Sequence, residues 1–365
     1  KVIIPMKKIF IFGYYGFKNI GDEAILSSII DTLRKIDPNI TISALSYSAQ
    51  YTEDLHNIKA ISRNNLREIV RAIKEADLVI SGGGSLLQDV TSNRSLIYYL
   101  GIIYLAKKMN KKVMFYGNGI GPINKNISKY LINRVANKVD MIAVRDYNSL
   151  IELKSLGINR SIEVTADATF VLEPVSKNRV KEILDNQGIP TDKPLIGISV
   201  RPWKNDASLR KVLTGFGDYI TEKNMNILFI PMQPSRDIPV SREICESMKN
   251  RAYIIEEELN PREVMGLVGH MDILVGMRLH ALIFAAGMAV PMLGIEYDPK
   301  VKSFLDIIKQ INLGTVMEID ETKIRTEFDR LWHNRENNRN RLQQVNQNLK
   351  NKAEKNGILA YNLIK

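Results

Sequence analysis

The alternation of short apolar runs with longer stretches of helical periodicity constrains the fold of this chain most. Such alternation is typical of parallel sheets built from strand–helix–strand units. It occurs in two separate series, which join near residues 172–177. The predicted strands are Lys8–Phe12, Ile40–Leu45, Leu78–Ser81, Val113–Tyr116 and Met141–Val144, then Leu195–Val200, Ile227–Ile230, Tyr253–Ile255, Ile273–Val275 and Pro291–Ile295.

The two series predict an α/β protein with two Rossmann-like, doubly wound domains. We place the first domain at residues 1–173 and the second at 174–320. The polar residues 321–365 are expected to form a C-terminal helix that packs back on the first domain. Because ligands of doubly wound sheets bind outside the carboxyl ends of the strands, we expect the domains to face a cleft that holds the chemistry.

Metal-binding side chains are too scattered along the sequence to predict a zinc site. His56, His270, His280 and His333 have no short-range spacing to one another or to Cys245, the single cysteine. Cys245 falls in an expected helix without a histidine partner, which favours a structural thiol over a nucleophile. The first residues lack the apolar core of a signal peptide, so we expect a cytoplasmic protein.

Positive charge is concentrated at the two ends of the chain. Residues 1–172 carry 23 Lys and Arg against 15 Asp and Glu, and residues 320–365 carry 10 against 6. This distribution suits a phosphorylated substrate or peripheral contact with an anionic membrane at the inner face of the cell. Scattered, solvated charges are the alternative. Nucleic acid is not expected, because no helix-turn-helix, RNP or zinc-finger signature is present.

Glycine-rich loops follow three strands of the first series. The first, residues 13–23, is longer than a dinucleotide-binding turn and lacks the acidic residue that contacts a ribose, which argues against NAD. Its Asp22 could bind sugar hydroxyls, or it could simply cap the helix, with Glu23 favouring the helix dipole. Residues 81–89, with three consecutive glycines, and residues 116–122 admit a ligand close to the backbone, although a crowded turn would use glycine equally well.

Charged residues also follow the last strands of the first series. Arg145 and Asp146 come directly after one strand, and Asp167 follows soon afterwards. Ligand binding and a structural ion pair explain Arg145–Asp146 equally well. All these loops lie at strand ends, so together they predict a polar, sugar-binding edge.

The sharpest signal lies in the second series, where an apolar strand runs into Gly276-Met-Arg-Leu-His-Ala. Arg278 and His280 sit in the first turn of a helix, whose positive pole disfavours cations unless an anion is bound. Arg201, just past the first strand of this domain, is expected to point into the same cleft. Two arginines can grip phosphate and carboxylate groups through paired hydrogen bonds.

These motifs, together with Glu296-Tyr-Asp-Pro-Lys-Val, resemble those of the polysaccharide pyruvyl transferases, nearest the CsaB-type cell-wall branch. The resemblance covers about residues 7–310. It implies a glycosyltransferase-B-like fold, phosphoenolpyruvate as donor, and ketal formation on a sugar, in this branch an N-acetylmannosamine of a lipid-linked wall-polymer precursor. It also implies that no metal or organic cofactor is needed, since phosphoenolpyruvate is a substrate.

The resemblance also assigns roles to residues at the matching motif positions. The implied catalytic residues are His280, as the acid, Arg278 and Asp22. The implied donor-binding residues are Arg201, Arg278, Leu279, His280 and Lys300. The implied acceptor-binding residues are Tyr15, Asn19, Asp22, Gly83, Ser85, Asp89, Asn118, Arg145 and Asp167.

Two other functions suit the same sequence. A glycosyltransferase that uses a nucleotide sugar would also place a diphosphate on basic residues and helix ends of the second domain. A non-catalytic sugar- or membrane-binding protein would bind an acceptor without turning over a donor. Acceptor-dependent release of phosphate from phosphoenolpyruvate distinguishes all three.

Overall fold

A computed structural model describes residues 6–90, 92–204 and 206–365. The chain divides into two compact units. The first comprises the chain up to Leu172 together with Leu349–Lys365, and the second is Glu173–Asn348. The structure therefore groups residues 321–348 with the second unit, whereas we expected all of 321–365 on the first domain.

The first unit is a 7-stranded parallel sheet with the strand order β3-β2-β1-β4-β5-β6-β7. Its strands are β1 (Lys8–Phe12), β2 (Thr41–Ser46), β3 (Lys59–Ser62), β4 (Leu78–Gly82), β5 (Lys112–Asn118), β6 (Met141–Val144) and β7 (Ile162–Val164). Its helices are α1 (Ile20–Ile36), α2 (Ala49–His56), α3 (Leu66–Glu75), α4 (Asn93–Lys108), α5 (Asn126–Ala136), α6 (Tyr147–Ser155) and the 3₁₀ turn η1 (Ala168–Val171).

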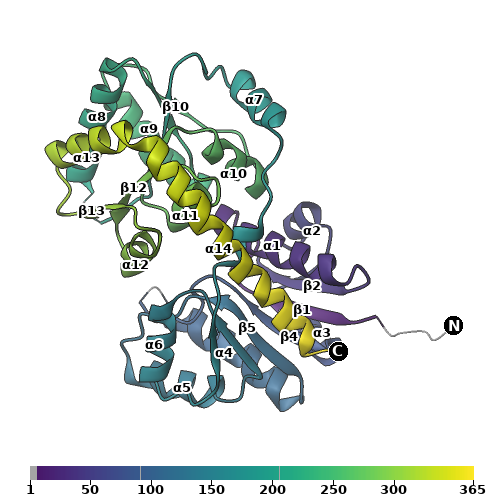
Figure 1. Cartoon of the computed structure of the whole chain (residues 1–365). Helices are drawn as coiled ribbons and strands as arrows, with labels where there is room; N and C mark the ends of the chain where they lie inside the picture. Colours follow the sequence, from purple (N-terminus) through teal and green to yellow (C-terminus); the bar gives the residue numbers. More distant parts are fainter. Residues whose placement is uncertain (1–5, 91, 205) are drawn as a thin grey trace. The chain divides into compact units, whose positions relative to one another are not determined.

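Alternate residues of each strand feed separate cores on the two faces of this sheet. In β1, Phe10 and Phe12 pack with apolar residues of α3, α4 and α5, whereas Ile9 and Ile11 pack with α1 and the end of the C-terminal helix. Figure 1 shows these helices alongside the strands of the sheet. Both faces are thus covered, which explains why the strands are continuously apolar.

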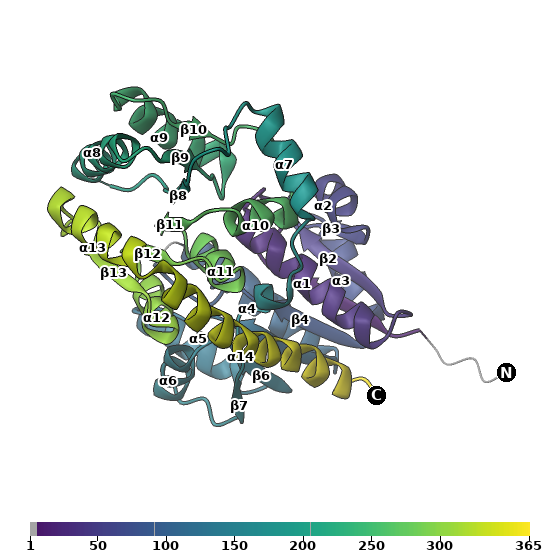
Figure 2. The same ribbon diagram turned by 45° about the horizontal axis from the view of Figure 1, so that its top comes forward.

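The second unit is a 6-stranded parallel sheet with the order β10-β9-β8-β11-β12-β13. Its strands are β8 (Leu195–Ser199), β9 (Asn226–Phe229), β10 (Tyr253–Ile254), β11 (Ile273–Gly276), β12 (Met292–Glu296) and β13 (Ile311–Thr315). Its helices are α7 (Lys177–Asn186), α8 (Ala207–Glu222), α9 (Pro234–Ser247), α10 (Pro261–Gly269), α11 (Leu279–Gly287), α12 (Pro299–Ile308) and α13 (Glu321–His333) (Figure 2).

The C-terminal segment forms two helices rather than the single one expected. α13 buries Ile324, Phe328 and Leu331 in the core of the second unit beside α8. The final helix, α14 (Arg335–Asn362), begins in the second unit and ends in the first. There, buried Asn356 accepts a hydrogen bond from Thr165 Oγ1 at 2.8 Å and donates one to the Ala166 carbonyl at 3.2 Å, so the end of the chain is fixed to the loop after β7.

No helix in the described ranges is both long enough and apolar enough to cross a membrane.

Candidate active site

Three neighbouring strands of the second unit bring the predicted donor-binding residues to one edge of its sheet. Arg201 follows β8, Arg278 follows β11 and Lys300 follows β12, and β11 pairs in parallel with both β8 and β12. The side chains of parallel strand ends lie at one edge, where doubly wound folds bind ligands. The structure therefore groups residues that are nearly 100 positions apart in the sequence.

Arg278 is anchored by a carboxylate that the sequence analysis did not identify. Its Nε donates to Asp237 Oδ2 at 3.0 Å, and its Nη2 bonds to Asp237 Oδ1. Asp237 is fully buried and also accepts the backbone N–H groups of Met232 and Gln233, at 3.0 and 2.9 Å. Two of the five guanidinium donors are thus engaged, so the plane of Arg278 is fixed while other donors remain for a ligand.

This ion pair changes the electrostatic argument drawn from the sequence. Arg278 is the N-cap residue of α11 with an extended backbone, and it is 8% exposed. We inferred that a cation at a helix start requires a bound anion, but Asp237 supplies a compensating anion from within the chain. The Arg278 position alone is therefore weaker support for an external anion than the sequence suggested.

Leu279 and His280 occupy the first turn of α11. Leu279 is buried, and His280 is partly exposed. The helix is held close to its strand, because a Cβ at Gly276 would lie 2.6 Å from Leu282 Cδ2. This close approach explains the glycine before the Arg-Leu-His motif and fixes the direction in which the helix begins.

Arg201 lies in an aromatic and cationic cluster at the ends of β8 and β12. Its guanidinium is 4.7 Å from the ring centre of Tyr297 and 5.6 Å from that of Trp203, and the two rings meet edge to face. Lys300 Nζ is 5.5 Å from the Tyr297 ring centre and 3.4 Å from Asp298 Oδ2. The rings hold both cations in place through cation–π attraction.

Two buried polar atoms at the end of β8 point to a missing partner. Ser199 Oγ and Arg201 Nε are buried and have no hydrogen-bond partner in residues 6–90, 92–204 and 206–365. Buried polar groups are nearly always paired with protein or water, so such atoms call for a ligand or ordered water. Either a bound ligand or an ordered water can supply these partners, and Arg145 Nη1 of the first unit is likewise buried without a hydrogen-bond partner in the described residues.

The first predicted acceptor loop, after β1, is held by internal hydrogen bonds. Tyr15 is 1% exposed, and its hydroxyl donates to the Gly82 carbonyl at 2.6 Å. Burial raises the pKa of this phenol well above its ordinary value of 10. Asn19 is the N-cap of α1, and its Oδ1 accepts from the Gly21 N–H at 3.1 Å. Partly exposed Asp22 follows in the first turn.

The three-glycine turn after β4 is fixed by the end of β5. Gly83 and Gly84 adopt φ values of 61° and 66°, which favour glycine. Buried Asn118 donates to Ser81 Oγ at 3.3 Å and to the Gly83 carbonyl at 3.1 Å, and the Gly119 N–H donates to the Gly84 carbonyl at 2.8 Å. A Cβ at Gly83 would also lie 2.6 Å from Ile25 Cγ2, so crowding of this turn favours glycine as well.

Asp89 is buried and stabilises the loop after β5 through hydrogen bonds. Its carboxylate accepts the backbone N–H groups of Asn124, at 3.0 Å, and Lys125, at 2.8 Å. Desolvation acts to raise the pKa of this carboxyl, but the backbone hydrogen bonds outweigh it and hold the pKa below its ordinary 3.8.

Arg145 links the loops after β4, β6 and β7. Its Nε is 3.2 Å from Asp146 Oδ2, its Nη1 is 3.5 Å from Asp167 Oδ2, and its Nη2 donates to Ser85 Oγ at 3.3 Å. Asp167 also accepts from the Thr169 N–H at 3.1 Å. The structural ion pair considered from the sequence is therefore present, and it extends into a network.

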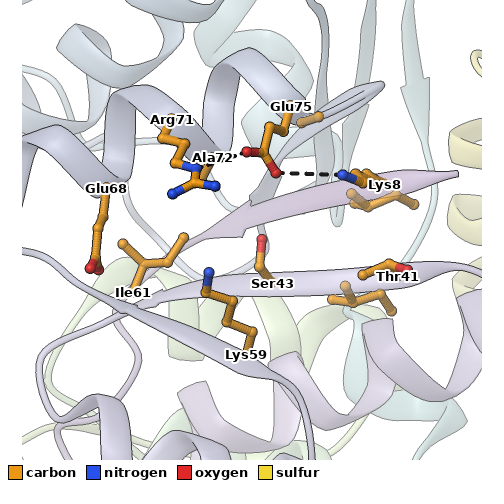
Figure 3. Close-up of a pocket in the computed structure, with 12 residues that line it drawn as sticks. Lys8, Thr41, Ser43, Lys59, Ile61, Glu68, Arg71, Ala72 and Glu75 are labelled. Atoms are coloured by element: carbon orange, nitrogen blue, oxygen red, sulfur yellow. Dashed lines mark hydrogen bonds and ion pairs between the residues drawn. The ribbon is translucent and has the colours of Figure 1, made fainter.

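A cavity of about 210 Å³ lies between α3 and the beginnings of β1, β2 and β3 (Figure 3). Glu75 accepts from Arg71 Nε at 2.9 Å and pairs with Lys8 Nζ at 3.4 Å. None of the residues that line this cavity was predicted as a site residue. The cavity lies at the amino ends of these strands, whereas the predicted site residues follow the carboxyl ends.

The described residues contain no cluster of three His, Cys, Asp or Glu side chains able to hold a metal ion. Burial raises the pKa of the Cys245 thiol to about 12, which keeps the thiol protonated at neutral pH.

Solved structures with a similar fold include a putative epimerase and a protein in complex with a nucleotide sugar. A putative UDP-N-acetylglucosamine 2-epimerase from Listeria monocytogenes has a TM-score of 0.66 at 13% identity, covering 96% of this chain and 94% of that chain. HepE of Anabaena in complex with UDP-glucose has a TM-score of 0.59 at 11% identity, covering 98% and 96%. These likenesses confirm the predicted fold class, two Rossmann-like domains of the glycosyltransferase-B type.

Sequence comparison identifies the family. The amylovoran biosynthesis protein AmsJ of Erwinia amylovora is 22% identical over 273 residues, which cover 68% of this chain and 62% of AmsJ. The chain thus spans less than two thirds of the length of this relative. Residues 19–299, more than half of the chain, match the family described as polysaccharide pyruvyl transferase. The chain belongs to the polysaccharide pyruvyl transferase family.

Proposed function

We propose that this protein is a transferase that moves a pyruvyl group from phosphoenolpyruvate to a sugar, with release of phosphate. The acceptor we propose is an N-acetylmannosamine in a lipid-linked cell-wall polysaccharide precursor, as in the CsaB-type branch. The observation that carries the donor assignment is the cluster of Arg201, Arg278, His280 and Lys300 at three adjacent strand ends, with Ser199 Oγ and Arg201 Nε buried beside it.

Phosphoenolpyruvate has the charge and shape that this cluster can bind. Its phosphate and carboxylate each accept paired hydrogen bonds from a guanidinium, and Arg201 and Arg278 can supply them. Asp237 occupies two of the five hydrogen-bond donors of the Arg278 guanidinium. We therefore assign Asp237 as the residue that orients Arg278. Lys300 adds a third positive charge next to Arg201.

In the proposed reaction, His280 protonates the methylene carbon of phosphoenolpyruvate. This creates a cationic centre at C2, which a sugar hydroxyl attacks while transferring its proton to a base. The C2–O bond to phosphate then breaks, and phosphate leaves with the proton held by that base. A second hydroxyl attacks C2 to close the cyclic ketal, and its proton returns to His280. We assign Asp22 as the carboxylate on the acceptor side. Histidine suits the acid because it changes protonation near neutral pH.

The experiment that tests this proposal measures phosphate released from phosphoenolpyruvate with and without an N-acetylmannosaminide acceptor. We expect release that depends on both compounds, and a product heavier than the acceptor by the pyruvyl ketal. Turnover of UDP-N-acetylglucosamine in place of phosphoenolpyruvate would instead establish the nucleotide-sugar glycosyltransferase. Acceptor binding without turnover of either donor would establish a non-catalytic binding protein.

A further inference from the structure

Three aromatic rings form a stack at the carboxyl ends of β1 and β2 in the first unit. The Tyr14 and Phe17 rings, both in the loop after β1, lie 4.0 Å apart at 6° to each other. Tyr47, directly after β2, lies 4.5 Å from Phe17 at 19°. We call Tyr14, Phe17 and Tyr47 the aromatic platform. None of the three was among the predicted site residues.

Buried groups hold the platform in place. Gly16, between Tyr14 and Phe17, has a φ of +80°, and a Cβ there would lie 2.1 Å from Ser46 Oγ. Its N–H donates at 2.8 Å to the fully buried Glu23, whose other oxygen contacts His56 Nε2 at 3.2 Å. The Tyr47 N–H donates to the Tyr15 carbonyl at 3.0 Å. These bonds couple the two ring-bearing loops to each other and to α1.

The outermost ring is exposed although its neighbours are packed. Tyr47 is 60% exposed, whereas Tyr14 and Phe17 are partly buried. The Arg63 guanidinium lies 5.5 Å from the Phe17 ring centre and 5.1 Å from that of Tyr98. The platform thus presents the exposed Tyr47 ring, and Arg63 lies near the adjacent ring, Phe17.

We propose that the aromatic platform binds a pyranose ring of the acceptor, with the apolar C–H face of the sugar against Tyr47. This inference rests on the proposed function in taking the acceptor to be a saccharide. A pyranose has a flat face of weakly positive C–H groups, which suits the negative face of an aromatic ring, and a rim of hydroxyls that Arg63 can contact. Because Phe17 already orders Tyr47, little side-chain entropy is lost on binding.

The platform lies beside the loops for which acceptor binding was predicted. β1 is flanked by β2 and β4 in the sheet, and Tyr15 joins the platform loop to Gly82 at the end of β4. A saccharide on Tyr47 therefore lies beside the predicted acceptor loop after β1, and β1 separates it from the three-glycine turn after β4. A lipid bilayer is less well matched, because Phe17 covers one face of Tyr47 and leaves a single flat surface the size of one ring.

The test compares Tyr47→Ala with Tyr47→Phe and with Tyr130→Ala, a control at a 56% exposed tyrosine on α5 of the same unit. Binding of the methyl glycoside of N-acetylmannosamine is followed by saturation-transfer NMR without donor. We expect saturation of the sugar ring protons in the wild type, Tyr47→Phe and Tyr130→Ala, and its loss in Tyr47→Ala. In turnover assays, Tyr47→Ala should raise the acceptor KM about tenfold and leave the KM for phosphoenolpyruvate unchanged.

The binding arm separates this inference from the proposed function, because it requires no donor. Saccharide binding that depends on Tyr47 without phosphoenolpyruvate turnover would support the platform and overturn the pyruvyl-transfer proposal. Equal saccharide binding by Tyr47→Ala and the wild type, or no binding by the wild type, would overturn the platform. So would a Tyr47→Ala protein that loses only its association with anionic phosphatidylglycerol vesicles.

Discussion

The two units share one architecture but use the polar residues at their strand ends differently. In the first unit, the predicted side chains mostly bind other parts of the chain: Arg145 joins Ser85, Asp146 and Asp167, and Asp89 holds a neighbouring loop. In the second unit, the Arg201 guanidinium and Lys300 Nζ lie against the Tyr297 ring, and Lys300 also pairs with Asp298.

This difference separates residues that shape a site from residues that contact a ligand. A carboxylate or guanidinium fully occupied by backbone and ion-pair partners builds a loop, and its removal should affect stability first. A cation such as Arg201, which lies against the Tyr297 and Trp203 rings, keeps hydrogen-bond donors for a ligand. We therefore expect variants of the second unit to alter donor use and variants of the first unit network to alter folding.

The largest effect is expected for Asp237→Ala, which tests whether the second unit also contains an internal network. The change leaves buried Arg278 without its partner and removes the acceptor for two backbone N–H groups. Breaking a buried pair in this way costs about 3–5 kcal/mol. Denaturant unfolding should show this loss, with Asp306→Ala on the surface of α12 as the control. A loss below about 1 kcal/mol would contradict the anchoring role.

Next in size is His280→Ala, which should lower kcat by about 100-fold or more, because general-acid catalysis supplies 10²–10⁴-fold. The melting temperature and the KM for phosphoenolpyruvate should change little. The matched control is His270→Ala, an exposed histidine that ends α10 in the same unit. A lowered melting temperature with normal activity of the folded fraction would identify His280 as a packing residue instead.

In the first unit, Asp89→Asn should lower the unfolding free energy by about 1–3 kcal/mol at pH 7, because two backbone donors lose a charged acceptor. The folded-state pKa of Asp89 is depressed, so its contribution is present above the ordinary pKa of 3.8 and is lost as the pH falls through the folded value.

Urea unfolding of both proteins between pH 3 and pH 7 checks this dependence. The difference between wild type and Asp89→Asn should be largest at pH 7 and shrink in acid, whereas Asp54→Asn, on the surface of α2, should show neither effect. A difference that grows as the pH falls would contradict the assignment of the hydrogen bonds.

The smallest effect is expected for membrane contact, which we propose from the excess positive charge of residues 1–172 and 320–365. Each basic residue near an anionic surface contributes about 1 kcal/mol. Sedimentation should show more protein bound to vesicles containing phosphatidylglycerol than to neutral vesicles, and less at high salt. Equal binding to both vesicles, or binding insensitive to salt, would support scattered solvated charges.

The sequence predicted the central strands of both sheets better than their edges. β1 has the predicted bounds, Lys8–Phe12, because its residues are apolar on both faces. β3, β7 and β13 were not predicted, and all three are edge strands. β7 has three half-buried residues, and β13 contains Asn and Gly, so neither shows the apolar run of a central strand.

The site was predicted where one motif carries it and missed where distant segments meet. Arg278 and His280 share a helix start that is visible in the sequence, whereas Asp237 reaches Arg278 from another helix, 41 positions away. Tyr47 and Phe17 follow different strands, so no spacing in the sequence predicts that their rings stack. The sequence signal that could have identified Asp237 is an aspartate in the first turn of a helix that begins directly after Pro231-Met-Gln.

The most direct test of the central claim, that the second unit holds the donor, is calorimetric titration of phosphoenolpyruvate without acceptor. We expect binding to the wild type, at least tenfold weaker binding to Arg278→Lys because an ammonium cannot replace the planar guanidinium, and unchanged affinity in Arg145→Lys of the first unit. Affinity that stays within about twofold in Arg278→Lys, or that falls in folded Arg145→Lys instead, would contradict the assignment of the donor to the second unit.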